Sequence, residues 1–163
     1  MKKSLAFILS ALCILIGCES SKNQRPLQTT GLQYDTSQIA ILPWIDRSYP
    51  FRGSGFKQAE LTQRDLEVID SLFLASVKIY NQDQAPTNVY SGIDLIKRNY
   101  RRQLVAVENK KGEKVVWVNC FCAPMGEWKT RIVFVHDGGT CFFNFQINPT
   151  KKTFSDFVVN GDA

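Results

Sequence analysis

Three cysteines in the second half of the chain, Cys120, Cys122 and Cys141, are the residues best suited to carry chemistry. Cys120 and Cys122 are two apart on a predicted strand, which places their Cα atoms about 6.6 Å apart on one face, near the upper limit for a disulfide. If the chain folds as successive hairpins, Cys141 lies about 20 Å from Cys122. We therefore expect buried, small apolar side chains. A disulfide, which needs a different topology, and a metal or redox role for Cys120-Phe121-Cys122 are the alternatives.

The single histidine, His136, precedes an Asp137-Gly138-Gly139 turn. A thiol enzyme needs its nucleophile and base within hydrogen-bonding distance, and a Cys141–His136 pair across one hairpin would meet that need. We interpret His136 as structural or solvated instead. Because the sequence shows no acid–base pair, no cluster of metal ligands and no phosphate-binding loop, we predict no catalytic residue, no metal site and no cofactor.

The densest basic cluster contains Lys97, Arg98, Arg101 and Arg102, with Tyr100 between them. Basic residues interleaved with an aromatic side chain can contact phosphate groups. We interpret the cluster as a solvated face, with anionic lipid headgroups or glycans as the alternative partners. Nucleic acid is not an expected partner.

An unusually aromatic C-terminal region offers a second candidate surface. Phe142 and Phe143 are adjacent on a predicted strand and therefore point to opposite faces of its sheet. Both faces would then carry large apolar groups, although only one clear helix is predicted. Either residues 39–44 and 46–57 cover the second face, or that face binds a partner.

The N-terminal segment has the pattern of an export signal. Lys2 and Lys3 precede an apolar run of 13 residues, Ser4 to Ile16, which is shorter than the ~20 residues of a membrane-spanning helix. The run ends in Leu15-Ile16-Gly17-Cys18, which resembles the lipobox of bacterial lipoproteins. The resemblance implies cleavage before Cys18, acylation of that residue, and anchoring in the bilayer. Because Glu19 follows in place of a retention aspartate, an outer membrane is favoured.

The remaining sequence divides into a tether and one domain. Residues 1–17 are interpreted as a signal peptide, residues 18–38 as a lipidated polar tether, and residues 39–163 as a single domain. Hydrophobic residues make up 44% of the chain and the net charge is +5. This composition excludes a disordered or collagen-like chain, and the charge is too small to argue for nucleic-acid binding.

Periodicity predicts an α+β domain. Apolar residues at helical spacing follow a capping-box-like pair, Thr62 and Asp65, and predict one main helix over about 62–81. Alternating residues then predict an antiparallel meander of about five strands at 102–108, 114–122, 129–136, 140–147 and 152–159. The run at 39–42, which ends before Pro43, fits an edge strand or a packing arm.

A helix followed by a meander is similar to the cystatin-like architecture. The inhibitory Gln-x-Val-x-Gly hairpin of cystatins is matched at Gln103 and Val105, but Val107 replaces the glycine. Protease inhibition is therefore not expected. The favoured function is a membrane-anchored, non-enzymatic envelope module that binds a protein, peptide or glycan. The alternatives are a thiol-dependent enzyme or redox protein that uses Cys120, Cys122 or Cys141, and a carrier of a lipid-like ligand.

Overall fold

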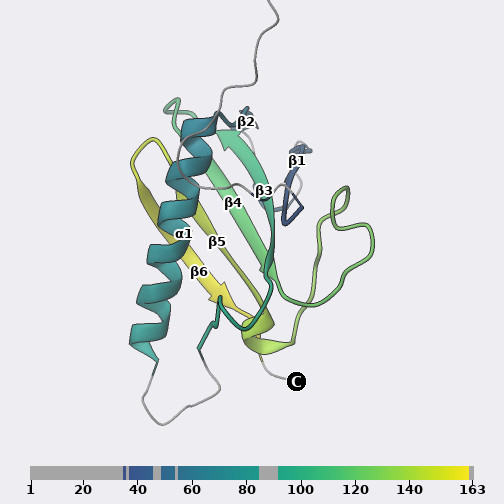
Figure 1. The fold of residues 1–163 in the computed structure, drawn as a ribbon. Helices are drawn as coiled ribbons and strands as arrows, with labels where there is room; N and C mark the ends of the chain where they lie inside the picture. The colour runs from purple at the N-terminus through teal and green to yellow at the C-terminus, as the bar shows by residue number, and fades with distance from the viewer. Residues whose placement is uncertain (1–34, 36, 46–48, 54, 85–91, 162–163) are drawn as a thin grey trace, which may run out of the picture. The chain divides into compact units, whose positions relative to one another are not determined.

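The computed structural model describes residues 35, 37–45, 49–53, 55–84 and 92–161. The predicted signal peptide, Cys18 and nearly all of the predicted tether lie outside these residues. The described part contains one long helix and a six-stranded mixed sheet, which confirms the α+β class. Strand order is β1-β3-β4-β5-β6, with β2 also paired to β3. Figure 1 shows the helix lying across one face of this sheet.

Helix α1, Gln63–Asp83, begins at the predicted capping box. Thr62 Oγ1 accepts a hydrogen bond from the Asp65 amide at 3.2 Å, and the Asp65 carboxylate accepts one from the Thr62 amide at 2.8 Å. The helix buries Ile69, Phe73 and Val77 at helical spacing. The local signal thus fixes both the start of the helix and the face that it turns to the sheet.

Four antiparallel strands form the main part of the sheet: β3 (Arg101–Glu108), β4 (Lys114–Phe121), β5 (Phe142–Asn148) and β6 (Thr153–Val159). Each pairs with the next along the chain, so four of the five predicted strands are confirmed. Gly112, at φ +74°, takes the left-handed conformation in the turn between β3 and β4.

Two short strands make the sheet mixed rather than purely antiparallel. Strand β1, Ile39–Leu42, runs parallel to β3 at the edge of the sheet, and β2, Lys57–Gln58, pairs antiparallel with the end of β3. The prediction of a simple antiparallel meander is wrong at this edge. The chain between β1 and β3 includes all of α1, and such a long crossover permits parallel pairing.

The predicted strand over 129–136 is wrong, because these residues form no strand. Strand β4 pairs directly with β5, and residues 123–138 cross the second face of the sheet as an irregular loop, here called the cover loop. Its run from Ile132 to Val135 has the composition of a strand. Its backbone, however, is held by side chains that rise from the sheet, as described below.

Each face of the sheet has its own hydrophobic core. The core under α1 is built from the helix and from residues of β3, β4 and β5 that alternate with those of the second core. The second core lies under β1, residues 49–56 and the cover loop. Phe143 is buried in the first core and Phe142 packs against the second, which confirms that they point to opposite faces.

Candidate functional site

The candidate site is an apolar groove on the second face of the sheet, between the segment after β1 and the cover loop. It has a volume of about 540 Å³. Two large apolar side chains at the groove are exposed to solvent, Ile45 at 70% and Phe134 at 61%. The groove is lined by Leu42, Pro43, Ile45, Tyr49, Arg52, Thr130, Arg131, Ile132 and Phe134.

Two amide side chains of the sheet fix the middle of the cover loop. Gln103, on β3, is fully buried, and its Nε2 donates to the carbonyl oxygens of Trp128 and Arg131, the latter at 2.7 Å. Its Oε1 accepts from the Val133 amide at 2.9 Å. Asn119, on β4, donates to Gln103 Oε1 at 3.1 Å and to the Val133 carbonyl at 2.8 Å. These bonds replace the backbone ladder that a strand would have formed.

A third amide holds the end of the cover loop. Asn160, just after β6, donates to the carbonyl oxygens of Val135 at 2.6 Å and Asp137 at 3.1 Å. Because the amides of Asn119 and Asn160 already donate to backbone oxygens, they are not free donors for a ligand. The cover loop is therefore positioned by side chains on three different parts of the sheet.

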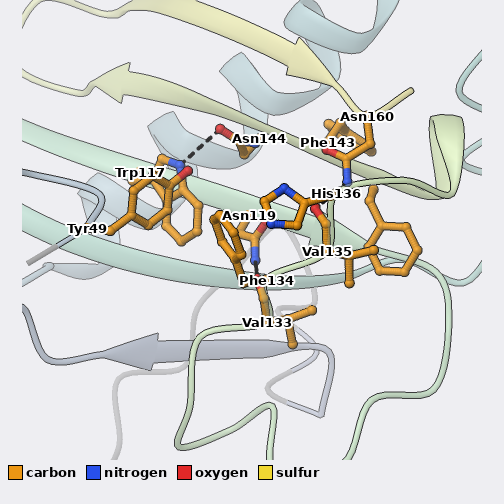
Figure 2. A pocket seen from close by; sticks show the side chains of 11 residues that line it. Tyr49, Trp117, Asn119, Val133, Phe134, Val135, His136, Phe143, Asn144 and Asn160 are labelled. Carbon is orange, nitrogen blue, oxygen red and sulfur yellow. Dashed lines mark hydrogen bonds between the residues drawn. The ribbon is translucent and has the colours of Figure 1, made fainter. Parts of the chain in front are cut away.

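A smaller pocket of about 210 Å³ adjoins the groove and shares Tyr49 and Phe134 with it. Figure 2 shows side chains of the cover loop, Phe134 and His136 among them, opposite Trp117 and Asn144 of the sheet. Trp117 Nε1 donates to Asn144 Oδ1 at 3.2 Å.

The rings around this pocket meet edge to face. Tyr49 lies 5.1 Å from Trp117 and 5.6 Å from Phe134, and Phe134 lies 4.8 Å from His136, measured between ring centroids. This geometry is favourable for aromatic pairs, and Phe134 takes part in two of these contacts while its side chain stays 61% exposed.

Positive charge borders the groove. The Arg52 guanidinium lies 6.0 Å from the centroid of the Tyr49 ring and forms no ion pair with any residue that the structure describes. Arg131 forms an exposed pair with Glu127 at 3.2 Å. Burial raises the pKa of Tyr49 above its usual 10.0, although its hydrogen bond with Trp117 and the charge of Arg52 act in the opposite direction. The tyrosine is therefore neutral at physiological pH.

The expectation that all three domain cysteines are unpaired is wrong. Cys122 and Cys141 form a disulfide with an S–S distance of 2.07 Å. The geometric objection assumed a strand between β4 and β5. Because β4 pairs directly with β5, Phe121 is opposite Phe142, and the next residue outward on each strand brings Cys122 beside Cys141. The disulfide thus closes the base of the cover loop.

The third cysteine, Cys120, is free and completely buried in the core under α1. Burial strongly raises the pKa of its thiol, which the charge of Arg102 only partly opposes. A buried thiol of this kind is a poor nucleophile. The disulfide also removes Cys141 as a partner for His136, so the considered Cys141–His136 dyad is not formed. Among the described residues, no group of three or more His, Cys, Asp or Glu side chains is placed to hold a metal ion.

The four basic candidates do not form one surface. The Arg102 guanidinium pairs with Asp70 and lies over the Phe73 ring, which places it beside α1. Arg101, on the opposite face, lies over the Trp128 ring at 5.7 Å.

The other two basic side chains also have local partners. Arg98 donates to Thr140 Oγ1 at 2.8 Å, and Lys97 lies 3.6 Å from the Asp94 carboxylate. Of the four, Lys97 is the most exposed, with 85% of its side chain accessible beside its contact with Asp94. Phe142 and Phe143 pack into the two cores, and Phe143 is not accessible to a ligand.

Sequence reasoning missed the groove because it placed the cover loop inside the sheet. A usable signal was present in β3 and β4, the two strands that form the first hairpin. Gln103 and Asn119 are polar residues that adjoin the apolar runs 104–107 and 115–118 of their strands, and buried polar side chains must find partners. That pattern indicates a segment of backbone crossing the sheet at this point.

Comparison with known protein families, curated proteins and solved structures finds no match to this chain. Within the residues that the structure describes, no helix has the length and apolar character needed to cross a membrane.

Proposed function

We propose that this chain is a lipid-anchored module of the bacterial envelope that binds a peptide segment of a partner protein in the groove between Ile45 and Phe134. The observation that carries the proposal is the exposure of these two apolar side chains beside Arg52, at a groove that borders the second hydrophobic core. A matching segment would place an apolar side chain against Phe134 and a carboxylate near Arg52, which lacks an acidic partner among the described residues.

The lipid anchor rests on the lipobox resemblance at Leu15-Ile16-Gly17-Cys18. The disulfide between Cys122 and Cys141 supports export, because disulfides persist in oxidising compartments outside the cytoplasm. Outer-membrane placement follows from Glu19, as in the sequence-based expectation. The helix followed by four antiparallel strands supports a cystatin-like architecture as part of the same proposal.

A peptide suits the groove better than a glycan does. Sugar recognition needs amide or hydroxyl groups that are free to pair with the sugar hydroxyls. In the groove, the Thr130 hydroxyl donates to the Glu127 carbonyl at 3.2 Å, and in the adjoining pocket the amides of Asn119 and Asn160 donate to backbone oxygens. The other two functions considered from the sequence lack support. Of the three cysteines that the structure describes, a thiol enzyme would have only the buried Cys120. The space between α1 and the sheet, where a lipid-like ligand would lie, contains stacked phenylalanine rings.

The groove is tested by placing a photo-crosslinking amino acid at residue 134 in the full chain, in native membranes. We expect an adduct that is absent when the same group replaces Ile79, a half-exposed residue on α1. Arg52→Glu should remove the adduct, because it reverses the charge that faces the partner's carboxylate. An adduct that is identical at positions 134 and 79, or that survives Arg52→Glu, contradicts the proposed groove.

The anchor is tested independently by labelling cells with palmitate. We expect labelled wild-type protein and no label in Cys18→Ala. Label that persists in the variant, or a wild-type protein that is recovered without lipid, would show that the lipobox resemblance is misleading.

A further inference from the structure

The turn between α1 and β3 exposes an apolar side chain almost completely. Ile96 is 98% exposed. The turn that carries it is well fixed, because Asp94 Oδ1 accepts hydrogen bonds from the amides of Ile96 and Lys97 at 3.0 and 2.9 Å. Its base is held to α1 by Asn81, whose side chain accepts from the Ile93 amide at 2.8 Å and donates to the Ile93 carbonyl at 2.9 Å. The fold therefore presents Ile96 outward on a turn whose backbone is held by four hydrogen bonds.

Other apolar and basic side chains surround Ile96. Leu74, which is 54% exposed on α1, and Leu95 line the hollows on both sides of the turn together with Ile96. Lys78 borders one hollow and Lys97 the other. We call these five residues, Leu74, Lys78, Leu95, Ile96 and Lys97, the docking ridge.

The chain enters the domain beside this ridge. Gln38 Nε2 donates to Asn99 Oδ1 at 2.7 Å, and the Gln38 carbonyl accepts from the Arg102 amide at 2.8 Å. Gln38 also lines the same hollow as Ile96 and Lys97. Any segment that leads from the anchor to the domain therefore joins it next to the ridge.

We propose that the docking ridge inserts into the interface of an anionic bilayer. Ile96 and Leu74 would enter the boundary between headgroups and acyl chains, while Lys78 and Lys97 pair with lipid phosphates, the arrangement typical of interfacial membrane contacts. This proposal rests on the lipid anchor of the proposed function, because the anchor would raise the effective concentration of the ridge at the bilayer. A chain of about 20 residues reaches at most about 70 Å even when fully extended, so an anchor at Cys18 would keep the ridge near the bilayer and make a weak contact effective.

The docking ridge and the groove lie on opposite sides of the sheet. Ile96 and Leu74 belong to the side of the sheet that carries α1, whereas Ile45 and Phe134 belong to the second face. One surface can therefore contact the bilayer while the other binds a partner.

The test places a tryptophan at the ridge in the full chain, reconstituted in vesicles of phosphatidylglycerol and phosphatidylcholine with brominated acyl chains. Ile96→Trp is compared with Ile45→Trp, which introduces the same reporter at an exposed site on the second face. We expect the fluorescence added by Trp at position 96 to be quenched by the brominated chains, and that added at position 45 to be unquenched.

Charge reversal tests the basic contribution. In the Ile96→Trp background, Lys97→Glu should lower the docking equilibrium constant by about ten-fold or more, since each basic residue near an anionic surface contributes measurably to binding. Lys110→Glu, in the exposed turn at the other end of β3, makes the same change in net charge and should have little effect. Higher salt should weaken docking in the Ile96→Trp protein.

Equal quenching at positions 96 and 45, or no quenching at position 96, would overturn the proposal that the docking ridge inserts into the bilayer. A blue shift at position 96 without bromine quenching would indicate contact between copies of the protein and would also overturn it. Quenching is local to residue 96 and palmitate labelling is local to Cys18. Anchoring without quenching therefore refutes only the ridge, and quenching without acylation refutes only the anchor.

Discussion

The buried amide of Gln103 allows the sharpest test of how the groove is built. Gln103→Leu preserves the size of the side chain but removes all four of its hydrogen bonds, three of which go to backbone groups of the cover loop. An unsatisfied buried polar group costs about 1–3 kcal/mol. Because the cover loop can shift and admit water, we expect the lower end of that range for each group, and a loss of about 3 kcal/mol in the free energy of unfolding.

The assay is urea denaturation with the disulfide intact, together with hydrogen exchange at the Val133 amide. Gln146→Leu is the matched control, because Gln146 lies on β5 on the same face of the sheet and its side chain forms no hydrogen bond with any residue that the structure describes. We expect faster exchange at Val133 and weaker crosslinking from residue 134 in Gln103→Leu only. A Gln103→Leu protein that matches Gln146→Leu in both stability and Val133 exchange would refute the idea that this amide holds the cover loop.

Two further predictions concern other contacts. Replacing both Cys122 and Cys141 with serine should lower the free energy of unfolding by about 3 kcal/mol, because the disulfide restricts the unfolded chain over a separation of 19 residues. Urea denaturation measures this loss, and Cys120→Ala is the comparison because it removes a cysteine that forms no disulfide. Burial raises the pKa of Asp65, but hydrogen bonds from Lys114 and Thr62 outweigh it and hold the pKa below 3.8. The stability that Asp65 contributes is therefore present above pH 3.8 and lost as pH falls below it. Asp65→Asn should be destabilised by about 1 kcal/mol at neutral pH, and a difference from wild type that did not shrink in acid would contradict this.

Local signals in the sequence were sufficient for the elements that local contacts specify. The capping box at Thr62 and Asp65 fixed the start of α1, and four strands with turn residues between them were placed within a few residues. The parallel pairing of β1 was not predictable in this way, because it depends on contacts between residues more than 60 positions apart. The position of β1 at the edge of the sheet agrees with one of the two predictions made for residues 39–42.

The error at residues 129–136 spread to the candidate site. Alternating apolar residues predict an extended segment, but they do not say whether its backbone pairs with a neighbouring strand or with side chains. Placing these residues in the sheet separated Cys122 from Cys141 and hid the groove around Phe134. The two amides at positions 103 and 119 held the missing information, because they require partners that a simple meander does not supply.

The construction of the cover loop explains how an exposed phenylalanine can be kept in place. The disulfide joins the two ends of the loop, the amides of Gln103 and Asn119 fix its middle, and the amide of Asn160 holds its last residues. A loop held at so many points loses little conformational entropy when a partner binds, and preorganisation of this kind strengthens binding without adding contacts. The bonds to Val133 and Val135 hold the backbone on both sides of Phe134 close to the sheet and leave its ring 61% exposed at the edge of the groove, an arrangement that suits a binding surface.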